Sequence, residues 1–597
     1  MDILTLDFET YFADDFTLRK LTTEAYIRDP RFEVILLGVR YPDGSKEFYK
    51  GEEIERFMDE TDWSKTAVLA HHAQFDGLIL SHHYGVKPAF WFDTLSMARQ
   101  VLGNHLSVAL SSLAKHYGFQ EKTVPYDEFK GRRPMNIPWG LMELLGEGCL
   151  NDCDLTWKLF QTLLKGFPSE ELRIIDMTVR MFTEPHIVGD VDLLRKVQHE
   201  EWIRKADLLN ELGVTASDLQ SSAKFSAILE AEGVDVAYKD TAKGSVPAIA
   251  KTDDFMKGLV NDPNPRISGL AQARLDVRST IDETRAGRLA GMAERGGMAI
   301  YLQYCGAHTT RWSGGDKVNF QNLSRGSELR KALLSPRGHL IGVADLSQIE
   351  CRVENWFAGQ SDVLEAFATG RDLYSEMASA VYNKPINKKD NPEERHLGKV
   401  LVLGAGYGMG SIRLQATCKA GALGGPPIIL SGQQAQDAIN AYRARHPGVV
   451  KLWKDADFVL SQIVDGNEMQ WGPLHLKDKK MILPNGGWVN YTTMEYHEGE
   501  YRMKTRNGWT KYYGAKLVEN VVQALSRVVM SQAMLRIQHM GLRIVNTTHD
   551  EVMVLIPDDL LAQETFDRVI AAMTMTPSWL PGIPLAAEGG ISKRYDK

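Results

Sequence analysis

The chain has 597 residues, which at roughly 150 residues per domain predicts three to four domains with a substantial core. Its apolar fraction of 44% and charged fraction of 24% exclude a disordered or low-complexity protein. The formal net charge of -8 gives no overall basic surface of the kind that binds nucleic acid. A basic cleft can nevertheless coexist with acidic metal sites, so the local motifs are better evidence than the net charge for the kind of partner.

The N-terminal residues and the cysteines exclude further classes. MDILTLDFET lacks the basic region of a signal peptide, and no segment approaches the ~18 apolar residues of a membrane span. We therefore expect an intracellular protein with no membrane partner. Five scattered cysteines are too few for a disulfide framework, and the close pair Cys149 and Cys153 cannot complete a tetrahedral zinc site.

Acidic residues recur at element boundaries in the first 165 residues. The strand-like DILTLDFETY places Asp7 and Glu9 on one face of a strand, although this pair alone is typical of an ordinary acidic strand end. Asp76 heads a predicted helix in AHHAQFDGLIL, and Asp152 lies on another in LNDCDLTWKLF. Four carboxylates of this kind suit hard divalent cations.

Two nearby acids are not expected to be ligands. We interpret Asp93, in WFDTLSMARQ, as a local structural acid, and Asp154 as a solvated helix residue. From about residue 170 to 300 the apolar spacing is helical, with breaks around 232–247 and 261–266. We expect a helical arm with a looped tip.

Two motifs in the C-terminal half carry a second set of carboxylates. GHLIGVADLSQIECR predicts a strand ending at Asp345 and a helix starting near Gln348, with Glu350 in its first turn. GLRIVNTTHDEVMVLIP predicts a hairpin whose turn carries His549 and Asp550. The hairpin would project Asp550 toward Asp345, and such a pair can hold the two metal ions of phosphoryl transfer.

A polar stripe lies between these motifs, in ERHLGKVLVLGAGYGMG. Arg395, Lys399, Leu403 and Tyr407 recur every four residues, which places them on one face of a helix. A core helix would be apolar there, whereas two cations beside a leucine and a tyrosine suit a nucleotide triphosphate. The glycine run 404–410 lacks the βαβ context of a dinucleotide fingerprint, so we reject that interpretation.

Together, these motifs resemble family A DNA polymerases of the bacterial polymerase I type, and the four N-terminal acids resemble DEDD 3'-5' exonucleases. The resemblance implies a multidomain α/β and α+β fold, with a ribonuclease H-like 3'-5' exonuclease domain followed by a right-hand polymerase. The exonuclease would occupy 1–165, a helical thumb and the start of the palm 166–300, the palm 301–362 and 500–597, and the fingers with inserted hairpins 363–499.

The resemblance also implies residue roles. Asp345 and Asp550, with the Leu346 carbonyl nearby, would hold two Mg2+ ions, for which Mn2+ can substitute, and Glu350 would exclude a 2'-hydroxyl. Arg395 and Lys399 would bind the phosphates, Leu403 would contact the sugar and Tyr407 would stack on the template. His549 would lie by the primer end. The residues that would contact the primer-template are Arg311, Gln321, Asn322, Asn520 and Gln523.

Asn520 and Gln523 lie in the otherwise apolar LVENVVQALSRVVM, where buried amides satisfied inside the core are the alternative. The implied partners are primer-template DNA, dNTPs and replisome proteins such as a helicase or a processivity factor. We expect a monomer. Without room for a separate 5'-nuclease domain, the chain resembles the phage-encoded branch, which would work in the host bacterial cytoplasm.

Three departures and alternatives remain open. Gly148 stands where the exonuclease family has a tyrosine, and Glu147 where its other branch has histidine, so a weak or inactive nuclease is an alternative. Leu403 stands where the polymerase family has Phe or Tyr, which leaves discrimination at the sugar 3' position open. Two other functions remain candidates. One is a single-subunit RNA polymerase, and the other is a nuclease whose palm serves only as a duplex-binding module.

Overall fold

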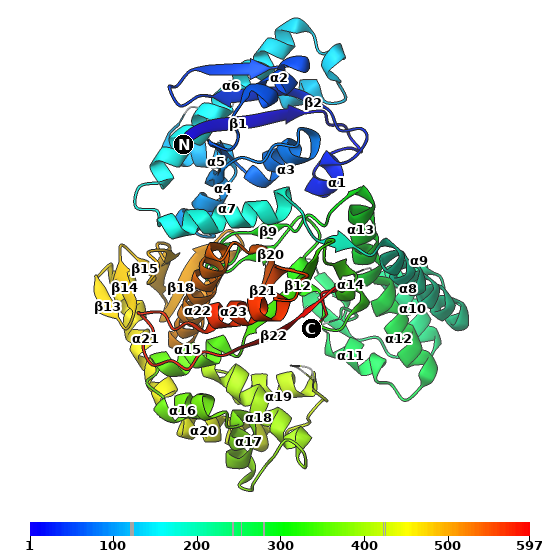
Figure 1. Cartoon of the computed structure of the whole chain (residues 1–597). Coiled ribbons are helices and arrows are strands. Elements are labelled where there is room, and N and C mark those ends of the chain that lie inside the picture. Colours follow the sequence, from blue (N-terminus) through cyan, green and yellow to red (C-terminus); the bar gives the residue numbers. More distant parts are fainter. Residues whose placement is uncertain are drawn as a thin grey trace.

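The computed structural model describes residues 1–596 apart from 120–123, 242–243, 252, 279–280, 422 and 424. Figure 1 shows a mixed sheet with its helices at one end, a helical bundle at the opposite end and a helical arm to one side of a central sheet. Among the described residues, no helix has both the length and the apolar content that a membrane span needs.

The N-terminal sheet has the strand order β3-β2-β1-β4-β5, with β1 antiparallel to β2 and parallel to β4. Successive side chains of a strand alternate between faces, so Leu6 and Phe8 of β1 are buried while Asp7 and Glu9 share the other face. The elements are β1 (Asp2–Thr10), α1 (Thr23–Ile27), β2 (Val34–Arg40), β3 (Lys46–Tyr49), α2 (Glu52–Glu60), β4 (Thr66–Ala70), α3 (Ala73–His83), β5 (Phe90–Asp93), α4 (Thr94–Leu102), α5 (Leu110–Tyr117), the 3-10 helices η1 (Tyr126–Phe129) and η2 (Pro134–Asn136), and α6 (Trp139–Leu163).

A helical arm follows, in which two long helices, α8 and α13, pack side by side. Its tip has a separate hydrophobic core around Leu219, Phe225 and Leu270. The tip also contains a hairpin, β7–β8, where we expected only a loop, because strands of four residues carry too little alternation to be recognised. Helix α7 (Ser169–Thr183) and strand β6 (Val188–Gly189) precede the arm, whose elements are α8 (Val191–Leu212), α9 (Ala216–Gln220), α10 (Ser222–Ala231), β7 (Tyr238–Thr241), β8 (Gly244–Pro247), α11 (Asp254–Val260), α12 (Pro265–Arg278) and α13 (Ile281–Arg295).

The central sheet is antiparallel throughout, with the order β20-β21-β12-β22. The structure confirms the predicted strand ending near Asp345 and the predicted C-terminal hairpin. Helix α22 packs against β20, and α23 packs against β12 and β22. The elements are β9 (Leu302–Gln303), β10 (Ser313–Gly314), η3 (Phe320–Asn322), α14 (Glu328–Lys331), β11 (Leu333–Leu334), β12 (His339–Leu346), α15 (Ile349–Phe357), α22 (Gly514–His539), β20 (Arg543–Thr548), β21 (Glu551–Pro557), α23 (Ala562–Thr574) and β22 (Ala587–Ser592).

The segment between α15 and α22 forms a helical bundle followed by two small antiparallel sheets. The bundle has its own core, which includes Leu401, Leu414 and Tyr442. The sheets have the orders β13-β14-β15-β16 and β17-β18-β19. The elements are α16 (Ser361–Thr369), α17 (Leu373–Tyr382), α18 (Pro392–Gly404), η4 (Ala405–Tyr407), α19 (Ser411–Lys419), α20 (Gly432–Arg445), α21 (Pro447–Asp465), β13 (Met469–Trp471), β14 (Leu474–Lys477), β15 (Lys480–Ile482), β16 (Trp488–Asn490), β17 (Met494–His497), β18 (Glu500–Thr505) and β19 (Gly508–Tyr512).

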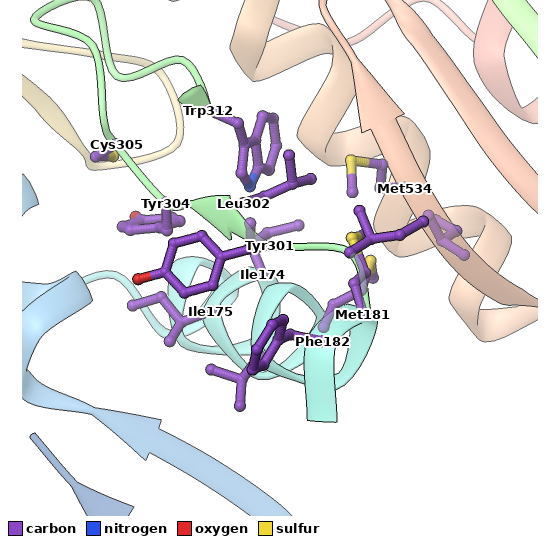
Figure 2. Close-up of a cluster of buried hydrophobic side chains, with 14 of the residues drawn as sticks. Ile174, Ile175, Met181, Phe182, Tyr301, Leu302, Tyr304, Cys305, Trp312 and Met534 are labelled. Carbon is purple, nitrogen blue, oxygen red and sulfur yellow. The ribbon is translucent and has the colours of Figure 1, made fainter. Parts of the chain in front are cut away.

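Helix α7 lies between the N-terminal sheet and the central sheet. Beside its apolar contacts it carries a buried charge, Glu171, which pairs with Arg527 of α22, and both side chains are only 2% exposed. Tyr304 and Asn485 also donate to Glu171. Burial alone would raise the pKa of Glu171, but Arg527 and these donors outweigh it and lower the pKa. Figure 2 shows the surrounding core, with side chains of Ile174, Ile175, Met181, Phe182, Tyr301, Leu302, Trp312 and Met534.

We expect Glu171→Gln to destabilise the protein by on the order of 3 kcal/mol, because it leaves the Arg527 charge buried without its partner. The measurement is the midpoint of urea unfolding followed by tryptophan fluorescence. Glu170→Gln, at an exposed position of the same helix turn, is the matched control and should leave the midpoint unchanged. Equal midpoints for both variants would contradict the role of this pair.

Candidate active sites

The central sheet brings Asp345 and Asp550 together. In the β12–β21 ladder Asp345 lies opposite Glu551, and the Leu346 amide donates to the Asp550 carbonyl oxygen at 2.9 Å. His549 takes a left-handed conformation with φ 53°, which closes the turn between β20 and β21. Two residues 205 positions apart in the printed sequence therefore present carboxylates at one end of the sheet.

Two arginines offset the charge of these carboxylates. Arg311 donates to Glu350 and to the Asp550 Oδ1 atom, the latter at 3.4 Å, and Arg325 donates to the Asp345 Oδ2 atom at 2.8 Å. Burial raises the pKa of Asp550 to about 7, although the nearby Arg311 charge lowers it. Such a crowded carboxylate pair is suited to divalent cations, which would compete with the arginines for the same oxygens.

Glu350 lies in the first turn of helix α15, as predicted, and links the central sheet to the helical bundle. The Tyr407 hydroxyl donates to the Glu350 Oε2 atom at 2.7 Å. One turn later, burial raises the pKa of Glu354 to about 8, and the Glu350 charge raises it further. A Cβ atom at Gly406 would lie 2.3 Å from the Glu354 Oε2 atom, so a larger residue there would require the Glu354 carboxylate to move.

The predicted four-residue stripe is only partly continuous. Helix α18 ends at Gly404, and Tyr407 lies in the following 3-10 turn, because glycine is a poor residue for continuing a helix. Arg395 pairs with Asp372, with 2.6 Å between its Nε atom and Oδ2. Lys399 donates to the Leu423 carbonyl oxygen at 2.8 Å. Leu403 is partly exposed on the same helix.

The predicted primer-template residues differ in exposure. Gln321 is buried and donates to the Thr547 carbonyl oxygen at 3.3 Å, whereas Asn322 is exposed. Asn520 is buried, and its amide donates to the Tyr512 hydroxyl at 3.0 Å. The structure therefore favours the buried-amide interpretation of Asn520 over groove contact, because a tyrosine of the neighbouring sheet supplies its partner. Gln523 is partly exposed on the same helix.

A second acidic cluster lies on the N-terminal sheet. The Phe8 amide donates to the Asp76 Oδ1 atom at 3.1 Å, which ties α3 to β1. Burial raises the pKa of Asp76 well above its usual range, and the charge of Asp7 raises it further. Asp152 is buried on α6, the helix that packs against β1 and β2. The sheet thus gathers Asp7, Glu9, Asp76 and Asp152.

Two further residues of this cluster were missed by sequence reasoning. The Tyr126 hydroxyl donates to the Glu9 Oε1 atom at 3.0 Å. The buried Cys149 thiol donates to the Asp7 Oδ2 atom at 3.4 Å, and burial raises its pKa, so it acts as a donor. No local pattern marks Tyr126, because its partner is 117 positions away. Burial also raises the pKa of Tyr126, and three carboxylates raise it further: Glu9, Asp152 and Asp7.

The two remaining acids have structural roles. Asp93 accepts from the Leu95 and Ser96 amides as the N-cap of α4, which confirms the expected structural acid. Asp154 is not simply solvated as we expected. It pairs with Arg40 and Lys46, and so ties α6 to β2 and β3, because helix packing on the sheet brings the strand cations within reach.

The chain belongs to DNA polymerase family A, whose family model matches residues 197–597. This span contains the central sheet, the bundle and the arm from within α8 onward. A similar solved structure is the POL domain of Pol1 from M. smegmatis in complex with DNA primer-template and dNTP, with a TM-score of 0.67 and 19% identity. The match covers 99% of this chain and 95% of that one, and it shows the same fold.

Among individual proteins, the chain is similar to the DNA polymerase of Bacillus phage SP02, with 24% identity and 100% of both chains covered. It is also similar to DNA polymerase I of Pseudomonas aeruginosa, with 23% identity over 82% of this chain and 52% of that protein. The thermostable DNA polymerase I of Thermus aquaticus is 24% identical over 72% of this chain and 44% of its own length. The chain thus spans about half the length of these cellular relatives.

We expect Arg311→Met to tighten binding of Mn2+ to the DNA-free protein about tenfold, the effect of one pKa unit on a carboxylate that loses a nearby cation. The measurement is Mn2+ titration by electron paramagnetic resonance, in an Asp7→Asn background that weakens the N-terminal cluster. Arg337→Met is the control, since Arg337 is exposed before the other end of β12. Unchanged affinity in the Arg311 variant would show that the arginine does not compete with cations.

Proposed function

We propose that this family A DNA polymerase adds dNTPs to a primer 3'-hydroxyl by two-metal-ion catalysis at Asp345 and Asp550. The observation that carries this proposal is the convergence of these two carboxylates at one end of the central sheet. Mg2+ is the expected ion, with Mn2+ as a substitute, because all the available side-chain ligands are hard oxygens. The primer-template DNA and dNTP named for the similar solved structure support the choice of substrates.

The reaction forms a bond between the primer 3'-oxygen and the α-phosphorus, and breaks the bond from that phosphorus to the pyrophosphate leaving group. When bound, the metal ions would lower the pKa of the 3'-hydroxyl and neutralise developing charge. Arg395 and Lys399 would hold the triphosphate, and both would first leave their present partners, Asp372 and the Leu423 carbonyl. Arg311 would likewise exchange the carboxylates for DNA.

Glu350 is the proposed sugar filter. It lies beside the Asp345 and Asp550 pair, and its two oxygens accept from Arg311 and Tyr407. After Arg311 exchanges for DNA, the Tyr407 hydroxyl would still hold one Glu350 oxygen, so a 2'-hydroxyl on the incoming sugar would meet a carboxylate kept in place by that hydrogen bond. This position favours deoxynucleotides and disfavours the alternative of a single-subunit RNA polymerase.

We further propose that residues 1–165 are a 3'-5' proofreading exonuclease. The strand order of the N-terminal sheet, with two antiparallel pairs on one side of β1 and two parallel pairs on the other, supports the ribonuclease H-like assignment. Asp7, Glu9, Asp76 and Asp152 would hold the metal ions there. The remaining boundaries keep their proposed assignment: thumb in 166–300, palm in 301–362 and 500–597, and fingers in 363–499.

Asp345→Asn and Asp550→Asn should each reduce primer extension by more than about 100-fold while leaving primer-template binding largely intact, because a metal ligand is lost. Extension of a labelled primer with dNTPs is the measurement, and Asp567→Asn, exposed on α23, is the control. Ribonucleotides in the same assay test the RNA polymerase alternative. Extension at the wild-type rate in either ligand variant would overturn the proposed polymerase site.

A 5'-labelled primer with a mismatched 3' end tests the nuclease. With Mg2+ and no dNTPs we expect shortening, and with dNTPs we expect full-length product. An Asp76→Asn variant should lose the shortening and keep extension of a matched primer. Extension without any shortening by the wild-type protein would instead support the alternative of an inactive editing domain.

A further inference from the structure

The space beside Gly148 is filled by another part of the chain. Gly148 lies on α6 one turn before Asp152, and a Cβ atom there would lie 1.9 Å from the Val124 Cγ2 atom. No side chain fits at position 148 while Val124 keeps its place. The absence of a side chain at Gly148 therefore allows the segment 124–129 to lie this close to α6.

Packing holds this segment in place. Phe129 at its end is 1% exposed and belongs to the same small core as Leu36 of β2, which lies opposite Glu9 in the β1–β2 ladder, and Leu145 of α6. Val124 and Tyr126 pack against that core. Beyond the segment, the Gly131 amide donates to the Phe12 carbonyl oxygen at 2.8 Å. Tyr126 is thus carried on an anchored turn.

The anchored turn directs one polar group at the carboxylates. The Tyr126 hydroxyl donates to the Glu9 Oε1 atom at 3.0 Å, on the side of β1 that Glu9 shares with Asp7. A phenol has one proton to donate and can also accept a hydrogen bond, so it can hold a carboxylate and contact a water at once. No charge is added to a site that already gathers four carboxylates.

We propose that Tyr126 is the positioning residue of the nuclease site, which holds Glu9 and the attacking water from a place made accessible by Gly148. The inference rests on the proposed exonuclease function. In the hydrolysis, the water oxygen bonds to the terminal phosphorus, and the bond from that phosphorus to the preceding 3'-oxygen breaks. The attacking water gives up a proton to solvent, the released 3'-oxygen takes one up from solvent, and Tyr126 itself gains and loses none.

The test compares Tyr126→Phe with Tyr117→Phe, a partly buried tyrosine of the same domain. For degradation of a single-stranded oligonucleotide, we expect kcat of Tyr126→Phe to fall about 10- to 100-fold, as for other groups that orient metal ligands, with little change in KM. Tyr117→Phe should match the wild type. Extension of a matched primer should be unchanged in both variants, which verifies that they fold.

A second measurement does not depend on turnover. In an Asp550→Asn background, which weakens the polymerase site, Tyr126→Phe should lower Mn2+ affinity several-fold by freeing Glu9, as measured by electron paramagnetic resonance. Wild-type kcat and Mn2+ affinity in Tyr126→Phe would overturn the role of Tyr126 while leaving the nuclease intact. If the wild-type protein itself degrades nothing, the proposed exonuclease fails, and the role of Tyr126 fails with it.

Discussion

The buried ion pair between Glu171 and Arg527 connects the parts of the molecule that carry the two acidic clusters. Burying both charges is costly, and the cost is offset because Tyr304 and Asn485 add hydrogen bonds and the Trp312 ring lies 4.7 Å from the guanidinium. Glu171 is on α7, which also accepts the Trp91 amide of the N-terminal sheet, while Arg527 is on the long helix behind the central sheet. This contact therefore helps to fix the relative placement of the clusters.

The two acidic clusters are balanced by different groups. On the central sheet, charged arginines offset the carboxylates, with Arg311 beside Asp550 and Arg325 beside Asp345. On the N-terminal sheet, the Tyr126 hydroxyl donates to Glu9 and the Cys149 thiol donates to Asp7, and these neutral donors orient the carboxylates without cancelling their charge. In the proposed function, the arginines of the first cluster would turn to DNA, and metal ions would bring positive charge to the second.

The end of helix α18 places a side chain that connects the helical bundle to the central sheet. Because α18 ends at Gly404, Tyr407 turns away from the helix and reaches Glu350 at the start of α15. This hydrogen bond joins the helical bundle to the central sheet at the proposed nucleotide site. A movement of the bundle would therefore displace the Tyr407 hydroxyl that holds Glu350. The same movement would carry Arg395 and Lys399, because both lie on α18.

The sequence by itself determined the local elements: the strand ending near Asp345, the hairpin around Asp550 and the shared face of Asp7 and Glu9, because hydrophobic periodicity encodes which face of an element is buried. It also carried the family motifs. Only the tertiary structure decided that Tyr126 reaches Glu9, that Asn520 is satisfied inside the core and that Asp154 pairs with strand cations. These contacts join segments far apart in the chain, and periodicity carries no information about which distant segments meet.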